Sequence, residues 1–382
     1  MKSAMVLAGE SRGTLTVTRA LGQLGIPVYV GSSDFLSRSA FSKYCKKSFI
    51  YSSPYENDLE KAHKDILHHV KKFKPDVLFP GGAETSHIVF KYAAEYEKYC
   101  RVMANLGSKR FSDFEDKAFQ TKTAKKFGYG IPKTYFPKNL DDVKRISKKI
   151  SYPALIKPRI STAGIGIQEA LHPAQLISEY EKMTTQKKSY RFDPKNPLIQ
   201  ELVEGQKFFL YGVFDRGRPI VGVLFHNFRI YPKWGNPLLI VSVRNDAVMQ
   251  ETMRFMKKMK WHGLFCLQGA IDVKDGRPKF FEISPRLGGL TGGVITSGVN
   301  IPHILFRMAL GERVERRIGY STNRKFRSMQ FGELFYFLES KHKLSLLKEY
   351  LSFKNTKTDF ELRDPLPNII RFVDLVVNRA VL

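Results

Sequence analysis

The sequence is poor in cysteine, in long apolar stretches and in acidic residues, and each shortage narrows the classes of protein that it could encode. Its three cysteines, Cys45, Cys100 and Cys266, are scattered over 382 residues and form no CxxC or Cys/His spacing. That pattern argues against a zinc site and favours a reducing cytoplasm. No apolar run approaches the roughly 20 residues that a bilayer-spanning helix needs, so no transmembrane segment is expected.

Acidic residues are outnumbered, because 36 Asp and Glu stand against 63 Lys and Arg, giving a net charge of +27. Such a field attracts nucleotides, acidic metabolites, nucleic acid or a membrane surface. The basic residues are spread along the chain, so solvated helix faces explain them equally well. An aromatic content of 13% also permits a basic nucleic-acid-binding protein. The sequence has no RNP, KH, helix-turn-helix or zinc pattern, however, and no nucleic acid is expected.

The first region, residues 1–112, alternates strand and helix patterns. "AMVLAG" at 4–9 and "IPVYVG" at 26–31 are typical of short buried strands, and the helical pattern between them ends at Gly25. A helical stretch, "DLEKAHKDILHHVKKF", and a strand pattern, "PDVLFPGG", follow. This order predicts a Rossmann-like, doubly wound parallel sheet of the α/β class. Its ligands would bind at the carboxyl ends of the strands, in the loops 9–13 and 81–85.

From residue 113 the pattern indicates an α+β arrangement. Residues 113–197 hold a basic helix and then "YPALIKPRISTAGIGI", a strand that ends at Lys157 and a loop of small residues. Backbone N–H groups of such a loop can approach a polyphosphate while the lysine supplies positive charge. An ordinary β-turn is the alternative, since no GKS or GKT follows. Residues 198–312 begin with a strand in "LIQELVEG" and continue as two hairpins that turn at "DRGRP" and "KDGRP".

The second hairpin carries the most specific chemistry. Gln268 and Glu282 lie on its two strands, and pairing about the turn at 275–276 would put both side chains on one face of the sheet. Two oxygen ligands on adjacent strands suit Mg²⁺, which completes its shell with water and phosphate oxygens. Arg286 follows closely and can grip a phosphate with two N–H groups. In the structural alternative, Glu282 caps a turn and pairs with Arg286.

Taken in order, four segments make residues 1–312 resemble the ATP-grasp superfamily, especially its carboxylate–amine ligases and the large chain of carbamoyl phosphate synthetase. The segments are "EDKAFQTKTAKKFGYGIPKT", "YPALIKPRISTAGIGI", "LIQELVEG" and "LQGAIDVKDGRPKFFEISPR". The resemblance implies a Rossmann-like domain followed by a two-part ATP-grasp fold with antiparallel sheets. It also implies ATP as cofactor, with Mg²⁺ or Mn²⁺.

The resemblance assigns roles residue by residue. Lys117 and Lys157 would contact nucleotide phosphates, and Arg286, together with Lys157, would stabilise the transferred phosphoryl group. Gln268, Glu282 and Ser284 would hold the metal. The remaining positions would form the lid loop (Ser161, Thr162, Gly164 and Gly166) and the adenine slot (Gln200, Glu201, Val203 and Glu204).

Two positions depart from the family pattern. Ser284 replaces the usual Asn, and a hydroxyl is a weaker metal ligand, so the number of metal ions stays open. Phe208 stands where a carboxylate for the ribose is expected, with Glu204 as the substitute.

The implied activity is an ATP-dependent ligase that forms an acyl phosphate, joins it to an amine or a thiol, and releases ADP and phosphate. A nucleotide-binding protein without catalysis is the alternative within the fold. The carboxylate would be a small molecule or polymer-linked. Candidate anchors are Arg229, Lys233 and Arg244 for a carboxylate, with Trp234 as a cover, and Glu84 and Ser11 for an amine. A surface position for these charges is the alternative.

Residues 313–382 match no mechanistic part and form a C-terminal extension. Ile369, Ile370, Val373, Leu375 and Val376 give its last helix an apolar face. We expect that face to pack on the body of the protein or on another subunit of a homodimer rather than on lipid.

Overall fold

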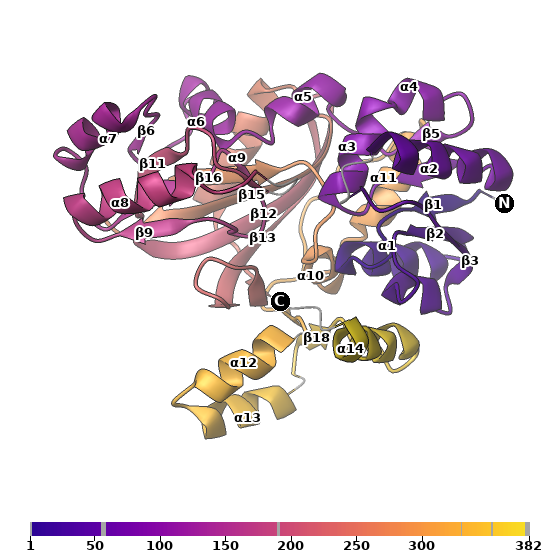
Figure 1. The fold of residues 1–382 in the computed structure, drawn as a ribbon. Helices are drawn as coiled ribbons and strands as arrows, with labels where there is room; N and C mark the ends of the chain where they lie inside the picture. Colours follow the sequence, from indigo (N-terminus) through magenta and orange to yellow (C-terminus); the bar gives the residue numbers. More distant parts are fainter. Residues whose placement is uncertain (1, 55–58, 189–191, 330, 353, 379–382) are drawn as a thin grey trace.

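The computed structural model describes residues 2–54, 59–188, 192–329, 331–352 and 354–378, without the side chains of residues 331, 375, 376 and 378 (Figure 1). Within these residues, no helix is both long and apolar enough to cross a membrane. The mixed α/β fold class predicted from the sequence is confirmed, with a five-stranded parallel sheet, a four-stranded antiparallel sheet and a mainly antiparallel seven-stranded sheet.

A five-stranded parallel sheet forms the N-terminal part, in the order β3-β2-β1-β4-β5. Its buried apolar strands and the amphipathic helices beside them follow the βαβ alternation of the sequence. The strands are β1 (Ala4–Val6), β2 (Val28–Ser32), β3 (Cys45–Ile50), β4 (Val77–Phe79) and β5 (Arg101–Val102). The helices are α1 (Arg12–Gly22), η1 (Arg38–Phe41), α2 (Leu59–Phe73), α3 (Ala83–Lys91), α4 (Ala93–Tyr96) and α5 (Ser108–Asp113).

A four-stranded antiparallel sheet, in the order β6-β11-β7-β9, forms a smaller unit at the far end of the molecule (Figure 1). A short β8–β10 pair lies beside it. The strands are β6 (Thr134–Tyr135), β7 (Ala154–Lys157), β8 (Ile160–Ser161), β9 (Gln168–Ala170), β10 (Phe192–Asp193) and β11 (Leu198–Glu201). The helices of this region are α6 (Lys117–Lys126), α7 (Leu140–Ser147) and α8 (Pro173–Thr184).

A seven-stranded sheet, in the order β16-β15-β12-β13-β14-β17-β18, crosses the middle of the molecule. Both hairpins expected from the sequence are present in it. The strands are β12 (Gly205–Asp215), β13 (Arg218–Ile230), β14 (Pro237–Ser242), β15 (Gly263–Asp272), β16 (Pro278–Ser284), β17 (Lys325–Arg327) and β18 (Thr356–Thr358). The helices are α9 (Asp246–Lys258), α10 (Thr291–Thr296) and α11 (Ile301–Ala309).

Strand β12 shows how the core is divided between the two faces of this sheet. Phe209, Tyr211 and Val213 belong to the apolar core that continues into the N-terminal parallel sheet. Phe208 and Leu210, on the opposite face, pack in a second core with the aromatic residues of α9 and β16. Because strand side chains alternate, one strand serves both cores.

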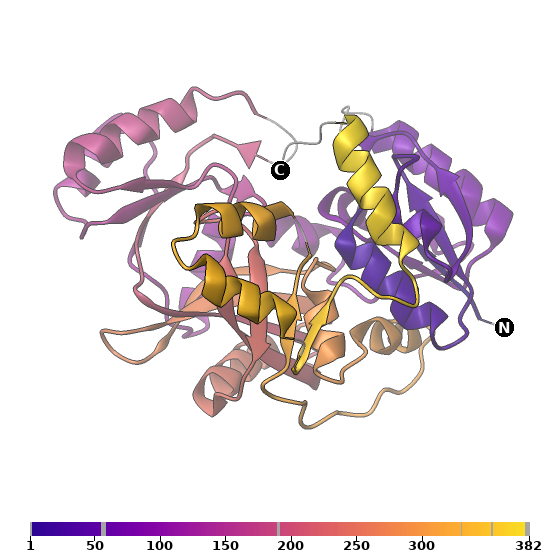
Figure 2. The same cartoon turned by 90° about the horizontal axis from the view of Figure 1, so that it is seen from below.

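The C-terminal extension adds strands β17 and β18 to the large sheet and three helices, α12 (Phe331–Glu339), α13 (Lys343–Leu351) and α14 (Leu366–Asn378). These helices lie together along one side of the molecule, at the bottom of Figure 1 and toward the viewer in Figure 2. Helix α14 packs against η1 of the N-terminal part. Its Ile369 and Val373 are exposed, so these two side chains do not pack on the body, and the expected packing on another subunit stays a prediction. Leu375 and Val376 lie outside the described side chains.

Candidate functional site

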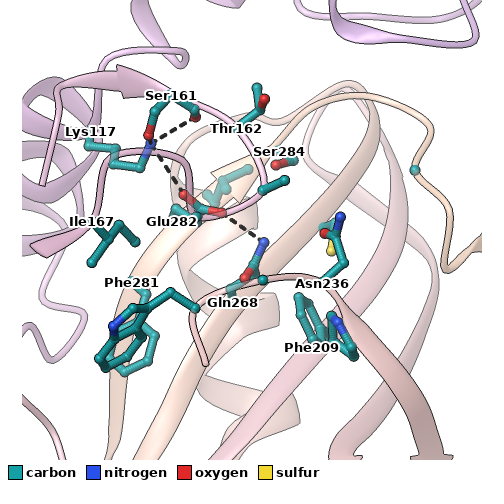
Figure 3. Close-up of a pocket in the computed structure, with 18 of the residues that line it drawn as sticks. Lys117, Ser161, Thr162, Ile167, Phe209, Asn236, Gln268, Phe281, Glu282 and Ser284 are labelled. Atoms are coloured by element: carbon teal, nitrogen blue, oxygen red, sulfur yellow. Dashed lines mark hydrogen bonds and ion pairs between the residues drawn. The ribbon is translucent and has the colours of Figure 1, made fainter. Parts of the chain in front are cut away.

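A cavity of about 270 Å³ lies between the four-stranded and seven-stranded sheets (Figure 3). Most of the residues predicted for a nucleotide and a metal line it. They are Lys117, Lys157, Ser161, Thr162, Gly164, Gln200, Glu201, Val203, Gln268, Glu282, Ser284 and Arg286. Figure 3 shows Lys117 and Glu282 facing each other across the cavity, with Gln268 on the far side of the carboxylate.

Lys117 is the first residue of α6, and its backbone holds it at the cavity wall. Asp116 caps the helix by accepting from the N–H of Ala118, and it pairs with Arg159 from the neighbouring loop. The Lys117 ammonium is 7% exposed and donates to the carbonyl and hydroxyl oxygens of Ser161, at 2.9 and 3.1 Å. Its Nζ lies 3.6 Å from Glu282 Oε2. Burial lowers the pKa of Lys117, and Glu282 opposes that shift.

Gln120 fixes the distance between Lys117 and strand β16. This buried side chain, one turn along α6, accepts from the Ile283 N–H at 2.7 Å and donates to the Ile283 carbonyl at 3.1 Å. Ile283 is the neighbour of Glu282 on β16. A paired amide contact of this kind sets both the separation and the register of helix and strand.

Lys157 ends strand β7 and is almost fully buried. Its Nζ donates to Gln200 Oε1 at 2.6 Å and stands 5.2 Å from the centre of the Phe281 ring. Gln200 in turn donates to Thr134 Oγ1 at 2.8 Å. Burial lowers the pKa of Lys157 to about 8, with Glu282 opposing the shift. No ion pair reaches this ammonium from the part of the chain that the structure describes, and Glu282 offsets only part of the cost of its burial.

The loop of small residues reaches across the cavity to the segment 231–236. Gly164 has φ +77°, and a Cβ there would stand 1.9 Å from the carbonyl oxygen of Trp234. Only glycine fits this contact without displacing the backbone. Gly166 does not line the cavity, because it packs against Phe192 and Pro158.

The register of β15 and β16 places Gln268 directly opposite Glu282, and Cys266 opposite Ser284. The sequence predicted that both side chains share one face of the sheet, and a β-bulge between Gln268 and Gly269 sets their direct pairing. Gln268 Nε2 donates to Glu282 Oε1 at 2.8 Å. One carboxylate, one amide oxygen and one hydroxyl suit Mg²⁺ bound together with phosphate oxygens, which needs few protein ligands. In the described residues, no group of three His, Cys, Asp or Glu could hold a metal. Because Gln268, Glu282 and Ser284 supply a single carboxylate, they suit a cation that phosphate oxygens also bind.

Arg286 lines the cavity beyond the end of β16. Among the described residues, no hydrogen bond or ion pair involves its guanidinium, so the alternative pairing with Glu282 is not present. Arg12, at the start of α1, lines the same end of the cavity and donates to the Ser328 hydroxyl. Burial lowers the pKa of Arg12. Two guanidinium groups from distant parts of the chain thus border one end of the cavity.

Of the basic residues proposed from the sequence as substrate anchors, Lys233 lines the cavity, whereas Arg229 and Arg244 do not. Lys233 lines the cavity, where it pairs with Glu169 at 2.5 Å. Arg229 does not line it, because its guanidinium is buried between Glu333 and Glu349, at 2.7 and 2.6 Å. Arg244 is exposed outside the cavity wall.

Glu84 and Ser11 also lie away from the cavity wall. Glu84 is buried in the first turn of α3, whose Ala83 and His87 do line the cavity. Ser11 caps α1 by accepting from the N–H groups of Gly13 and Thr14.

Neither residue considered for the ribose lines the cavity. Phe208 is buried in the core behind the sheet, and Glu204 is exposed outside the cavity wall. Lys207 and Phe209 line the cavity instead. Lys207 Nζ stands 4.7 Å from the centre of the Trp234 ring, and burial lowers its pKa. The period-two alternation of β12 was the signal that could have identified both residues. Arg12 lies in the loop 9–13 that the sequence marked for ligands, and Asn236, which also lines the cavity, was not singled out.

This arrangement, a two-part site between antiparallel sheets behind a Rossmann-like unit, is the ATP-grasp fold. The biotin carboxylase domain of Hydrogenobacter thermophilus 2-oxoglutarate carboxylase, solved with MgADP, ADP and bicarbonate, superposes with a TM-score of 0.69. The match has 18% identity over 85% of this chain and 73% of that one. The L-amino acid ligase of Bacillus licheniformis gives a TM-score of 0.65 at 15% identity, over 85% and 78% of the two chains.

In sequence, the chain is similar to carbamoyl phosphate synthase large chains, so the predicted resemblance is confirmed. The protein of Thermoanaerobacter sp. (strain X514) is 25% identical over 218 residues, which are 54% of this chain and 19% of that protein. The protein of Caldanaerobacter subterraneus is 24% identical over 268 residues, 67% of this chain and 24% of that protein. The chain thus spans about a fifth to a quarter of these relatives. No family model matches it.

Proposed function

We propose that this chain is an ATP-dependent ligase that activates a carboxylate as an acyl phosphate and joins it to an amine, with a thiol as the alternative acceptor. The observation that carries the proposal is one cavity that gathers Lys117, Lys157, Glu282 and Arg286. The named functions of the relatives and neighbours, which are synthases, carboxylases and ligases, support it.

In this proposal the adenine lies against the β11 hinge, beside Gln200, Glu201 and Val203. The phosphates lie toward Lys117 and Lys157, whose pKa values are lowered by burial, and a bound polyphosphate would stabilise the charged form of both lysines. Gln268, Glu282 and Ser284 would hold Mg²⁺, which would neutralise phosphate charge when bound. The domain boundaries near residues 112, 197 and 312 belong to the same proposal.

The reaction has two steps. A carboxylate oxygen of the substrate attacks the γ-phosphorus of ATP, the bond to the β-phosphate oxygen breaks, and ADP leaves. Arg286 and Lys157 stabilise the charge on the transferred group. The amine nitrogen then attacks the acyl carbon, and phosphate leaves as the amide forms and the nitrogen loses a proton. The contact between Gly164 and Trp234 would exclude water, which would otherwise hydrolyse the acyl phosphate.

Calorimetric titration of MgATP tests the nucleotide part of the proposal. We expect micromolar-range binding to the wild type, weaker binding to Lys157→Ala, and loss of the Mg²⁺ dependence in Glu282→Ala. Lys182→Ala and Glu179→Ala, which remove an exposed ion pair on α8, are the matched controls and should bind like the wild type. Absence of nucleotide binding by the folded wild type would refute the proposal.

Turnover needs a second measurement. ADP release would be assayed with a panel of carboxylates, each with and without amines or thiols. Release that depends on one carboxylate–acceptor pair supports the ligase. Binding of MgATP with no ADP release from any pair would favour the nucleotide-binding alternative without catalysis.

A further inference from the structure

The exposed apolar side chains of this protein are concentrated in the C-terminal extension. Of the large apolar side chains exposed in the described residues, half lie between Met329 and Val377. Leu344, Leu351 and Leu362 are 78%, 71% and 86% exposed. Isolated exposed apolar residues are ordinary, but a concentration of this kind marks an interaction surface.

Each of the three helices exposes an apolar stripe at helical spacing. A helix of a globular protein normally turns such a stripe toward the core. Here α14 does the reverse, because its Asp374 is buried while Ile369, Val373 and Val377 are exposed. The other stripes are Leu334 and Leu338 on α12, and Leu344, Leu347 and Leu351 on α13. The helices share one side of the molecule (Figure 2), which we call the C-terminal face.

Ion pairs with the body hold this face in place. Arg19 of α1 donates from Nε to Asp364 at 2.8 Å, in the segment before α14. Arg229 of β13 binds Glu333 of α12 and Glu349 of α13. The exposed stripes are therefore attached to the sheets through contacts that turn acidic side chains inward.

The same contacts leave the outside of the face basic. In the described residues from 331 to 378, Glu339 is the one exposed acidic residue, and it accepts from the hydroxyl of Tyr231. Six basic side chains of this segment are exposed: Lys341, Lys343, Lys348, Lys354, Lys357 and Arg363. Exposed leucines beside lysines are the composition of helices that lie in a membrane interface.

We propose that the C-terminal face docks on an anionic lipid bilayer, with its leucines in the interface and its lysines against the lipid phosphates. A second copy of the chain is a poorer occupant, because two bodies of net charge +27 would bring like-charged faces together. A nucleic acid would satisfy the lysines and leave the leucines in water. The proposal is independent of the ligase activity, since none of these side chains lines the cavity.

Vesicle flotation with the full chain tests the proposal. We expect binding to phosphatidylcholine vesicles that contain roughly 30% phosphatidylglycerol, little binding to phosphatidylcholine alone, and release as salt is raised. The triple variant Leu344→Gln/Leu347→Gln/Leu351→Gln should bind these vesicles at least roughly tenfold more weakly than the wild type. Leu24→Gln/Val273→Gln/Ile318→Gln changes exposed apolar residues elsewhere and should bind like the wild type.

Two triple variants that lose the same number of positive charges distinguish docking through the C-terminal face from general adsorption of a basic protein. Lys341→Gln/Lys343→Gln/Lys348→Gln should bind more weakly than Lys71→Gln/Lys72→Gln/Lys98→Gln, although both lose three charges. Equal weakening of the two would overturn the proposal. Absence of wild-type binding to the anionic vesicles would also overturn it and would favour an acidic protein as the partner.

Hydrogen exchange of the wild type with and without anionic vesicles needs no variant. The amides of α12, α13 and α14 should become protected. Protection confined to other elements would contradict the proposed face.

Discussion

Replacing Lys157 by methionine should weaken nucleotide binding and at the same time remove a free-energy cost to folding. The lysine is 9% exposed, and burial lowers its pKa from 10.5 to about 8. One pKa unit corresponds to about 1.4 kcal/mol. Keeping this ammonium charged in the cavity therefore costs the folded protein about 3 kcal/mol at neutral pH, as an order of magnitude.

The sign of the pH dependence follows from the lowered pKa. Below about pH 8 the folded protein carries the full cost of the buried charge. As the pH rises from about 8 toward 10.5, the folded state releases its proton before the unfolded state does, and the cost disappears. The wild type should thus gain stability relative to Lys157→Met over this range.

Lys157→Met also leaves Gln200 Oε1 without its 2.6 Å hydrogen bond. That loss costs about 1 to 3 kcal/mol, but it is the same at every pH. The difference in stability between the two proteins near neutral pH is therefore less informative than its change with pH. Between about pH 7 and about pH 10, the difference should shift by about 2 kcal/mol in favour of the wild type.

Urea unfolding of both proteins without nucleotide, at about pH 7 and about pH 10, measures this shift. Lys182→Met, at an exposed lysine of α8, is the control and should show no such shift. A wild-type to Lys157→Met difference that is equal at both pH values would refute the reasoning that Lys157 is a desolvated cation.

Four further outcomes follow from the site and its surroundings. MgATP affinity of the wild type should fall by up to about tenfold per pH unit above about pH 8, because unprotonated Lys157 cannot pair with phosphate; calorimetry across this range measures it. Gly164→Ala should weaken MgATP binding and change the urea midpoint little, since its Cβ would meet the Trp234 carbonyl in an exposed loop; the same two assays separate these effects. Arg229→Ala should destabilise the fold by about 3 to 5 kcal/mol because it leaves buried Glu333 without its cation, whereas MgATP affinity of the folded fraction should stay unchanged. Mn²⁺ should bind appreciably only when ATP is present, as read by electron paramagnetic resonance, because Gln268, Glu282 and Ser284 supply a single carboxylate.

The β15–β16 hairpin was predictable as a hairpin because "KDGRP" between two apolar runs is a short turn sequence. The register at the site was not predictable in this way, because a β-bulge between Gln268 and Gly269 shifts the pairing by one residue. This shift, and not the turn, puts Glu282 opposite Gln268. Lys157, like the hairpin, was predictable for a local reason, since it ends a buried strand just before a loop of small residues. In both cases the decisive information lies within about 20 residues of chain.

The surroundings of the cavity were not predictable in this way. Arg229 looked like a substrate clamp because it precedes the loop at 231–236. Its partners, Glu333 and Glu349, lie more than 100 residues later in the sequence, and the local sequence around Arg229 does not predict these contacts. Arg12 reaches the cavity only because α1 packs beside the end of β16, a tertiary contact between the two ends of the site.

The charge balance of the cavity gives a physical reason for reading it as a site for a polyanion. Lys117, Lys157 and Lys207 all have lowered pKa values, and in each case burial is the largest cause. Glu282 lies between the first two and cannot neutralise both. A protein selected only for stability would replace such lysines by apolar residues, because an uncompensated buried charge costs more than it contributes. A triphosphate supplies the missing negative charge, so MgATP should raise the urea midpoint of the wild type more than that of Lys157→Met.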